Sequence, residues 1–403
     1  MSNFAVVIGA GPAGLMAADK LASNGFKVLI VDRKPSFGRK FLMAGKSGLN
    51  LTKNENLEDF VSQFYEASDW MNPILRNFGP DAVSRWANGL NQNVFIGSSG
   101  RVFPTSMKAS PLLRSWLKKL QNMNINFETK WNWVGWKDNK LCFQTESGLV
   151  KIHPVVTILS LGGGSWRKLG SNGLWVKIMR DENILVNSLE PANVRLKVYW
   201  SDKMLPHYGK PLKNIILKAG RLLTRGEAVI SKSGLEGSAV YTVSKSAREG
   251  YDVFLDLLPD LSHNAIIKKL RQRNRKISFS KFLQKSLKLT EAKRAIFFEF
   301  SHPLPNDDKS LANLLKAVKV IYSGLGNLDE AISSSGGVSK KSFDNGLMLY
   351  KKPGVFVAGE MLDWEAPTGG YLINGCLATG SWAGLNASEW VKNNLISPSR
   401  HQR

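Results

Sequence analysis

The chain has 403 residues, of which 43% are hydrophobic and 22% charged, a balance that excludes collagen-like, disordered and polytopic membrane proteins. Its length predicts two or three domains. It contains 55 Lys and Arg against 32 Asp and Glu, and the resulting net charge of +23 bears on partners and solubility rather than on the fold.

Nothing in the sequence predicts insertion into a membrane or export across one. No apolar stretch approaches the roughly 20 residues that span a bilayer, and no cationic segment of the kind that opens a signal peptide precedes the first apolar run. The two cysteines, Cys142 and Cys376, are far apart and form no CxxC motif, which favours a reducing compartment. We therefore expect a cytoplasmic protein without thiol–disulfide chemistry.

The sharpest local signal lies at the start of the chain. Residues 4–8 form a short apolar run that predicts a parallel strand buried on both faces. The run enters the corner Gly9-Ala10-Gly11-Pro12-Ala13-Gly14, which continues into a helical stretch. In such a GxGxxG corner, Gly9 would permit the tight turn, Gly11 would let a pyrophosphate approach the backbone, and Gly14 would let the helix pack on the strand.

The residues after this corner strengthen the prediction of a dinucleotide site. A second apolar run, 28–31, ends in Asp32, where a carboxylate can accept hydrogen bonds from a ribose. The N–H groups and positive dipole end of the first helix favour phosphates. Three glycines alone recur by chance, but strand, helix, second strand and acidic residue together predict dinucleotide binding rather than a glycine-rich turn of another α/β fold.

Other catalytic motifs are absent or incomplete. Gly45-Lys46-Ser47 has the form of the end of a phosphate-binding P-loop, but Lys40 stands where that motif requires a glycine. The five histidines show no metal-ligand spacing, and neither HExxH nor GxSxG occurs. We therefore expect no metal site and no serine nucleophile. No second GxGxxG follows, so a separate nicotinamide-binding domain is not expected either.

The remainder of the first half predicts one helix and several strands. Residues 110–121 predict an amphipathic helix capped by Ser110. The apolar run 155–161 predicts a buried parallel strand that ends at Gly162-Gly163-Gly164, where a backbone could approach a ligand. Between them, an antiparallel meander is predicted by short runs at 125–128, 131–136, 141–145 and 149–152.

The middle of the chain differs from its flanks. Residues 191–332 contain 25 Lys and Arg against 13 Asp and Glu, and they predict strands over 194–243 followed by helices over about 262–332. Beyond them, residues 355–358 predict another buried strand, and a helix rich in small residues that permit close packing on the sheet is expected from about Tyr371. The expected domains are a split domain over 1–190 and 333–395, an inserted domain over 191–332, and a polar tail over 396–403.

Three separated segments resemble the FAD-binding domain of the glutathione-reductase-like flavoprotein superfamily: the opening unit 9–32, the strand into Gly162-Gly163-Gly164, and the closing unit 355–371. Within it, the chain resembles the BaiN-type flavoproteins, also labelled aminoacetone-oxidase-like, over roughly residues 4–390. The motifs behind this resemblance are Gly38-Arg39-Lys40-Phe41-Leu42-Met43-Ala44-Gly45, Gly100-Arg101-Val102-Phe103-Pro104, Gly226-Glu227-Ala228 with Gly234-Leu235-Glu236-Gly237, and Ala358-Gly359-Glu360-Met361-Leu362-Asp363 with Thr368-Gly369-Gly370-Tyr371. Residues 45–50 depart from the family pattern, because they keep the Asn but lack the Arg and Cys of its usual Arg-Cys-Asn segment.

The resemblance implies an α/β fold: a Rossmann-like FAD-binding domain, with a parallel sheet and an antiparallel β-meander, and an inserted β-then-α domain. It implies that the opening corner holds the FAD pyrophosphate and that Asp32 holds the adenosine ribose. Arg39 and Lys40 would lie near the adenosine–phosphate end. The implied cofactor-binding set is Gly9, Ala10, Gly11, Pro12, Ala13, Gly14, Asp32, Arg33, Arg39, Lys40, Val134, Gly163, Gly359, Glu360, Gly370, Tyr371 and Leu372.

Within this set, Val134 would offer backbone groups to the adenine edge, and Glu360 would bind the ribityl chain. The N–H groups of Gly370, Tyr371 and Leu372, if they open a helix, would point at the flavin N1/O2 edge, which becomes anionic when the flavin takes a hydride. Glu365 is the only candidate for a catalytic acid or base, and a solvated loop carboxylate is the simpler interpretation of that residue.

The expected function is that of an FAD-dependent oxidoreductase that transfers a hydride between the flavin and an unidentified small organic substrate, with NADH or NADPH as a transient donor. One alternative is an RNA- or polyanion-directed flavoenzyme, since residues 261–290 hold nine Lys and Arg and no acidic residue. A solvated helical face is the simpler interpretation of that run, which has few aromatic residues for base stacking, Phe279 and Phe282. A non-catalytic flavin-binding redox protein is the other alternative.

Overall fold

The computed structural model describes residues 4–45, 48–274 and 276–395. The chain divides into two compact units, which we call the split unit (residues up to 190 and from 333 onward) and the inserted unit (191–332). Each has its own hydrophobic core. Within the described ranges, no helix is both long enough and apolar enough to cross a bilayer. The polar tail expected over 396–403 lies outside the described residues.

The centre of the split unit is a five-stranded sheet in the order β20-β10-β1-β2-β6, with every pair of neighbours parallel. Its strands are β1 (Phe4–Ile8), β2 (Lys27–Asp32), β6 (Asn126–Thr129), β10 (Val156–Leu159) and β20 (Val355–Val357). This confirms the predicted Rossmann-like parallel sheet. Strands β1, β10 and β20 are mostly apolar and almost completely buried, as expected for a parallel sheet, whereas β6 at one edge is partly exposed.

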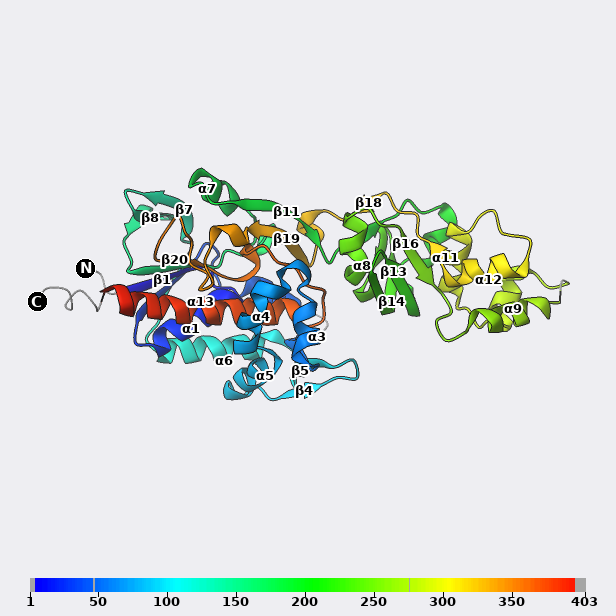
Figure 1. Cartoon of the computed structure of the whole chain (residues 1–403), viewed down its shortest axis with the longest axis horizontal. Helices are drawn as coiled ribbons and strands as arrows, with labels where there is room; N and C mark the ends of the chain where they lie inside the picture. The colour runs from blue at the N-terminus through cyan, green and yellow to red at the C-terminus, as the bar shows by residue number, and fades with distance from the viewer. Residues whose placement is uncertain (1–3, 46–47, 275, 396–403) are drawn as a thin grey trace, which may run out of the picture. The chain divides into compact units, whose positions relative to one another are not determined.

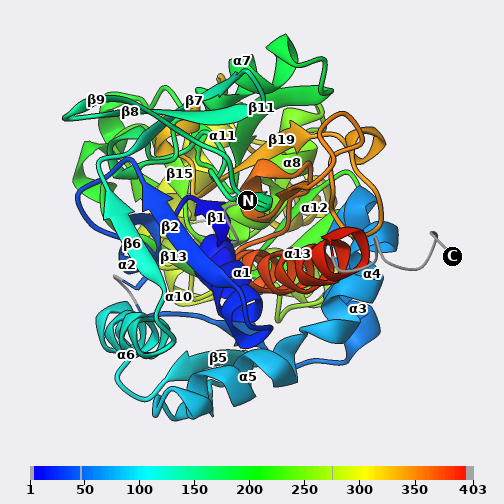
Figure 2. The same ribbon diagram turned by 90° about the vertical axis from the view of Figure 1, so that its left-hand side faces the viewer.

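Two helices far apart in sequence, α1 (Pro12–Ser23) and α13 (Tyr371–Leu395), lie side by side in both ribbon views (Figures 1 and 2). A Cβ atom added to Gly380 would lie 2.2 Å from the carbonyl oxygen of Ala13, and one added to Gly384 would lie 2.6 Å from that of Ala17. The small residues of α13 therefore permit close contact with another helix. The prediction that they serve close contact with the sheet was incomplete.

The predicted meander exists, but it has three strands rather than four. Strands β7 (Asn132–Lys137), β8 (Lys140–Thr145) and β9 (Gly148–Ile152) form an antiparallel sheet. The first predicted run instead forms β6, which pairs in parallel with β2. Local alternation cannot distinguish these outcomes, because the choice of partner strand depends on contacts distant in sequence.

A second small sheet and several helices complete the split unit. The described strands are β3 (Thr52–Lys53), β4 (Val94–Ile96) and β5 (Arg101–Pro104) in one sheet, and the pair β11 (Val186–Ala192) and β19 (Ser333–Val338). The described helices are α2 (Arg39–Ala44), α3 (Leu57–Ser62), α4 (Ser68–Asn77), α5 (Pro80–Gly89), α6 (Ala109–Asn122) and α7 (Trp175–Asp181). Ser110 does not cap α6, because the helix already begins at Ala109 and its N-cap position is Lys108.

The inserted unit is built on a seven-stranded antiparallel sheet in the order β17-β16-β13-β14-β15-β12-β18. Its strands are β12 (Leu196–Lys197), β13 (Pro211–Ala219), β14 (Leu222–Ser231), β15 (Gly234–Glu236), β16 (Val253–Asp256), β17 (Val318–Lys319) and β18 (Gly324–Leu325). Its helices are α8 (Ser238–Arg248), α9 (His263–Arg271), α10 (Phe279–Lys285), α11 (Glu291–Phe300) and α12 (Asp308–Lys316).

The simple strands-then-helices order predicted for this unit was wrong in two places. Helix α8 replaces the end of the predicted strand region, and β16, β17 and β18 follow it along the chain. The four later helices begin where the side chains of Ser262, Ser278, Thr290 and Asp307 accept a hydrogen bond from the backbone three residues on. Such N-caps satisfy backbone donors that a helix start leaves unpaired.

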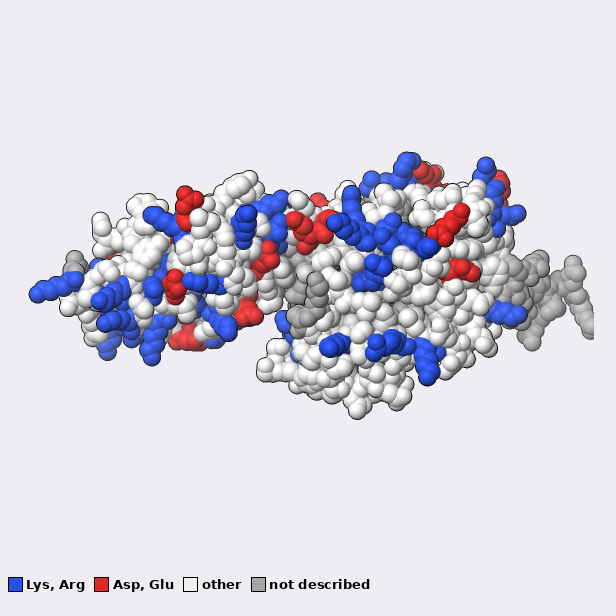
Figure 3. Space-filling view, turned by 180° about the vertical axis from the view of Figure 1, so that it is seen from behind, with Lys and Arg blue, Asp and Glu red and all other residues white. Residues whose placement is uncertain are grey.

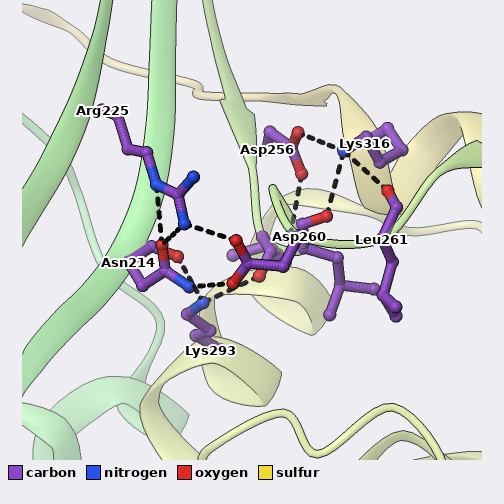
Figure 4. Close-up of polar contacts among 9 residues, drawn as sticks. Asn214, Arg225, Asp256, Asp260, Leu261, Lys293 and Lys316 are labelled. Atoms are coloured by element: carbon purple, nitrogen blue, oxygen red, sulfur yellow. Dashed lines mark hydrogen bonds and ion pairs between the residues drawn. The ribbon is translucent and has the colours of Figure 1, made fainter.

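A polar network joins β13 and β14 to α11 in the inserted unit (Figure 4). The Arg225 guanidinium contacts the Asp260 carboxylate and donates to the side-chain oxygen of Asn214 at 2.6 Å. The Lys293 ammonium donates to the carbonyl oxygens of Asn214 and Leu257, both at 2.8 Å. Burial lowers the pKa of Lys293, and the two carbonyl contacts satisfy the ammonium that burial removes from water.

Candidate functional site

A cavity of about 350 Å³ lies in the split unit, at the carboxyl ends of the parallel strands. This is the edge at which open α/β sheets bind ligands. Twelve of the residues predicted to bind a cofactor line it: Gly9, Ala10, Gly11, Pro12, Ala13, Asp32, Arg33, Arg39, Lys40, Val134, Gly359 and Glu360.

The opening corner has the geometry that a phosphate site needs. Gly9 has a φ of +102°, which L side chains rarely adopt. A Cβ atom added to Gly14 would lie 1.9 Å from the carbonyl oxygen of Gly9, so this glycine is required for packing. A Cβ atom added to Gly11 would meet no atom within 4 Å, because it would point into open space. Gly11 is thus the glycine that keeps room for a ligand.

Helix α1 begins at Pro12, directly after Gly11, and neither residue places a polar side chain over the helix start. The first N–H groups of a helix have no acceptor within the helix. Together with the dipole, such N–H groups favour an anion, and Gly11 and Pro12 both line the cavity.

Asp32 ends β2 and is held by the backbone on both sides. Its Oδ2 accepts a hydrogen bond from the N–H of Ala10 at 2.9 Å, and its Oδ1 accepts one from the N–H of Lys34 at 2.8 Å. Burial raises the pKa of Asp32, although these two hydrogen bonds oppose that shift. Each carboxylate oxygen keeps a second lone pair, so the side chain can still accept a hydrogen bond from a ligand hydroxyl.

Lys40 and Glu360 form an ion pair across the cavity wall, with their Nζ and Oε2 atoms 2.6 Å apart. The Lys40 ammonium also donates to Ser165 Oγ at 2.7 Å. Glu360 Oε1 accepts a hydrogen bond from the N–H of Ser334 at 3.0 Å. Lys40 therefore lies beside the residue expected at the ribityl chain, whereas the resemblance places it near the adenosine–phosphate end.

Three polar atoms of cavity-lining residues lack a hydrogen-bond partner among the described residues. They are Nε of Arg39, Nε1 of Trp133 and Oγ of Ser171, and all three atoms are buried. Buried polar atoms without a partner are rare and costly in native proteins. These three orphaned atoms, together with the open space at Gly11, fit a polar ligand that runs along the cavity, as the nucleotide part of FAD would.

The closing corner, by which we mean residues 370–372 at the start of α13, lies outside this cavity lining. Helix α13 begins at Tyr371, as predicted, but neither Gly370, Tyr371 nor Leu372 is among the lining residues. Gly370 has a φ of +109°, and a Cβ atom added to it would lie 2.4 Å from the carbonyl carbon of Thr52. The corner therefore packs tightly on β3, and substitution of Gly370 would disturb this packing directly.

The Tyr371 side chain lies in a small polar cluster next to this corner. Its hydroxyl donates to Glu55 Oε1 at 2.6 Å and accepts from Lys53 Nζ at 3.0 Å. Burial, and then the Glu55 carboxylate, raise the pKa of Tyr371 well above its usual value. The hydroxyl is therefore protonated at neutral pH. Glu365 is half-buried in the loop before this corner and does not line the cavity.

Gly163 also lies outside the lining, although Gly162 belongs to it. A Cβ atom added to Gly163 would lie 1.7 Å from Ser334 Oγ and 3.2 Å from the carboxyl carbon of Glu360. Gly163 therefore gives room to the groups that hold Glu360.

Sequence reasoning missed three lining residues that shape the cavity. Ser160 donates from Oγ to the carbonyl oxygen of Gly9 at 2.7 Å, and Trp175 donates from Nε1 to that of Gly162 at 2.9 Å. Burial raises the pKa of the Cys376 thiol, on α13, to about 12. Ser160 lies within the predicted run 155–161, directly after the observed strand β10, and could have been found. The positions of Trp175 and Cys376 in the cavity lining depend on the tertiary structure.

The sequence is also similar to a known protein family and to curated proteins. The family model for the HI0933-like protein Rossmann domain matches residues 3–386. The 3-dehydro-bile acid delta(4,6)-reductase of Clostridium scindens is 25% identical over 95% of this chain and 98% of the relative. The ribosomal RNA dihydrouridine synthase of Escherichia coli is 23% identical over 91% of this chain and 93% of the relative.

The fold is shared with solved flavoenzymes. A flavocytochrome c3 fumarate reductase in its open conformation superposes with a TM-score of 0.54 at 15% identity, covering 96% of this chain and 78% of that chain. At this identity the likeness concerns the fold alone. Because the family match spans nearly the whole sequence, the chain belongs to the HI0933-like, BaiN-type family of Rossmann-fold, FAD-dependent oxidoreductases.

Proposed function

We propose that this protein is a reductase that uses FAD to saturate a carbon–carbon double bond conjugated to a carbonyl group. The observation behind the proposal is the cavity with three orphaned polar atoms and the open space at Gly11, which suits a dinucleotide. The Clostridium scindens relative is named a delta(4,6)-reductase of a 3-dehydro-bile acid, and the Escherichia coli relative is named a dihydrouridine synthase, so both names describe the addition of hydrogen to a carbon–carbon double bond.

The residues of the site suggest a role for each group in the proposed reaction. Bound FAD would supply the hydride. The N–H groups around Gly11 would bind the pyrophosphate, and Asp32 would accept a hydrogen bond from the ribose. Glu360, positioned by Lys40, would bind the ribityl chain through the lone pairs that remain. The N–H groups of residues 370–372 would stabilise negative charge at the flavin N1/O2 edge.

Saturating a double bond requires a proton as well as a hydride. Glu365 remains our proposed source among the loop residues. The hydroxyl of Tyr371 is a second one, because it stays protonated at neutral pH and already contacts a carboxylate and an ammonium. NADH or NADPH would dock transiently as the electron donor. We also propose a cytoplasmic location, which the two free cysteines support.

The direct test is the absorbance spectrum of the purified protein, followed by anaerobic reduction with NADH and NADPH in turn. We expect a yellow protein whose spectrum bleaches with one donor and recovers when 2-cyclohexenone is added. Colourless protein that does not take up added FAD would refute the proposal. A protein that bleaches but is reoxidised only by oxygen or a quinone would refute the proposed substrate class.

The proposed contact between the closing corner and FAD needs a test other than enzyme activity. Gly370→Val would clash with Thr52 regardless of flavin, so we propose hydrogen exchange with and without FAD. We expect slower exchange of the N–H groups of residues 370–372 when FAD is present, with no change at the exposed Lys218. Equal exchange in both states would remove these residues from the proposed site.

RNA is the second candidate substrate. Charge favours it, since the inserted unit holds 25 Lys and Arg against 13 Asp and Glu. The relatives from Escherichia coli and Haemophilus influenzae are named ribosomal RNA dihydrouridine synthases. Conversion of uridine to dihydrouridine in RNA by the reduced protein, measured by mass spectrometry of nucleosides, tests this candidate directly.

A further inference from the structure

One stretch of the inserted unit combines dense positive charge with an absence of acidic residues along the chain. It comprises α9, α10 and the segments that follow each helix, and residues 261–290 contain no Asp or Glu. We call its exposed cations the cationic face. They are Lys268, Arg271, Lys276, Lys281, Lys285 and Lys288. Arg275 lies between them in sequence but outside the described residues. In Figure 3, Lys and Arg side chains gather on the helical part of this unit.

The side chains of the cationic face have no ion-pair partner among the described residues, unlike many other cations of the same unit. Lys210 pairs with Glu291 at 2.9 Å, and Arg195 pairs with Glu330 at 2.6 Å. Lys316 pairs with Asp256 at 2.5 Å and donates to two backbone carbonyls (Figure 4). Six like charges on adjacent segments repel one another. A polyanion would relieve that repulsion and release its own counterions.

The apolar residues of these helices are already used inside the unit. Ile266 and Leu270 of α9 and Phe282 and Leu283 of α10 are buried in its core. The exposed large hydrophobic residues include none between Tyr251 and Ile321. A helix that inserts into a membrane surface needs an exposed apolar face. The cationic face therefore suits a highly charged soluble polymer better than a lipid surface.

Aromatic stacking on bases is also not available here. Phe279 packs against Phe282 at 6.1 Å between ring centroids, and the Arg273 guanidinium lies 4.8 Å from the centre of the Phe279 ring. These side chains stabilise one another. Recognition through this surface would then rest on phosphates, as for folded or double-stranded RNA, rather than on unstacked bases.

We propose that the cationic face binds the sugar–phosphate backbone of folded RNA. The choice of RNA among polyanions rests on the second candidate under the proposed function. If all six cations contact phosphates, the logarithm of the binding constant falls with the logarithm of salt concentration with a slope of roughly −4 to −5.

The test compares two triple variants of the holoprotein with equal changes of charge. The first is Lys268→Glu with Lys281→Glu and Lys285→Glu, on the cationic face. The control is Lys218→Glu with Arg221→Glu and Lys232→Glu, which are exposed residues on or beside β13 and β14. The probes are an RNA hairpin of about 30 base pairs, DNA of the same sequence, and phosphatidylglycerol vesicles. Thermal unfolding verifies that both variants fold.

We expect the face variant to bind the hairpin at least 100-fold more weakly at low salt, with the salt slope reduced by about three. The control variant should lose less than fivefold. Equal losses in the two variants, no binding of the wild type, or stronger binding to the vesicles or to DNA than to RNA would overturn the proposal.

Flavin reduction and cyclohexenone turnover, measured on the same face variant, should match the wild type. This separates the two proposals. A colourless protein with intact RNA binding contradicts the proposed function alone, whereas a yellow, active protein that ignores RNA contradicts the cationic face alone.

Discussion

The cavity of the split unit and the cationic face of the inserted unit are built in different ways. The cavity depends on backbone groups, glycines and partly or fully buried side chains in fixed places, such as Gly11, Ser160 and Asp32. The cationic face consists of long, exposed side chains that can replace one another. Binding that depends on close packing is disrupted by a single misplaced atom. Electrostatic attraction acts over longer distances, and the contributions of several charges add together. Single substitutions should therefore abolish the first site and only weaken the second.

The largest effect is expected from Gly14→Ala in the opening corner. The added Cβ would lie 1.9 Å from the carbonyl oxygen of Gly9 and 2.4 Å from Ser160 Oγ, so helix α1 must move off the sheet. Overpacking of this kind costs about 3 kcal/mol or more. Urea unfolding of the protein freed of FAD measures it, and an unchanged midpoint would contradict the assigned packing.

Gly11→Val is the substitution to compare with Gly14→Ala, because it changes a glycine of the same corner that is not required for helix packing. Because nothing lies within 4 Å of a Cβ atom at Gly11, unfolding without FAD should match the wild type. The side chain would instead occupy ligand space. We expect FAD affinity to fall at least 100-fold, or about 2.7 kcal/mol, in a fluorescence titration. Normal affinity would mean that the pyrophosphate binds elsewhere.

Asp32→Asn tests charge in the same cavity. Protonation removes the negative charge that strengthens a hydrogen bond from a ribose hydroxyl, so FAD affinity should fall as the pH drops through the pKa of Asp32, which burial raises above its usual value. At neutral pH we expect the variant to bind about tenfold more weakly. Its affinity should no longer fall at acidic pH, and titrations across pH measure both effects. A pH profile unchanged from the wild type would show that Asp32 does not contact FAD.

Lys40→Met and Glu360→Gln, alone and combined, measure the ion pair in the cavity wall. The side chains are 29% and 12% exposed, so water screens the pair in part. We expect a coupling free energy of about 1–2 kcal/mol from a double-mutant cycle. A coupling near zero would mean that Ser334 and Ser165 hold these side chains equally well without each other.

The smallest effect is expected from a single substitution on the cationic face, where binding should depend on summed charge and not on one residue. Lys285→Ala removes one of six exposed cations, and we expect RNA affinity to fall about threefold or less, with a slope change of roughly one. Filter binding at several salt concentrations measures both. A loss of 100-fold from this residue alone would mean that the face recognises RNA at one point, as the cavity recognises its ligand, rather than by summed charge.

Much of the fold could be predicted because local patterns determine it. The apolar runs at 4–8, 28–31 and 155–161 formed parallel strands, and the helix expected from Tyr371 begins there. The errors concern which strand pairs with which, and which segment forms a helix. The run 125–128 joined the central sheet rather than the meander, and α8 formed where strands were expected. Alternation along a segment does not say which distant strand will pair with it.

By itself, the sequence determined the glycine corner, the acidic residue at the end of β2, the membership of a flavoprotein family and the charge of the inserted unit. Each of these is encoded within a few neighbouring residues or in composition. Only the tertiary structure decided that Lys40 pairs with Glu360, that Arg39 and Ser171 leave polar atoms unpartnered in one cavity, and that Gly370 packs on Thr52. These contacts join segments up to 320 residues apart, and such proximity arises from packing, which no local pattern contains.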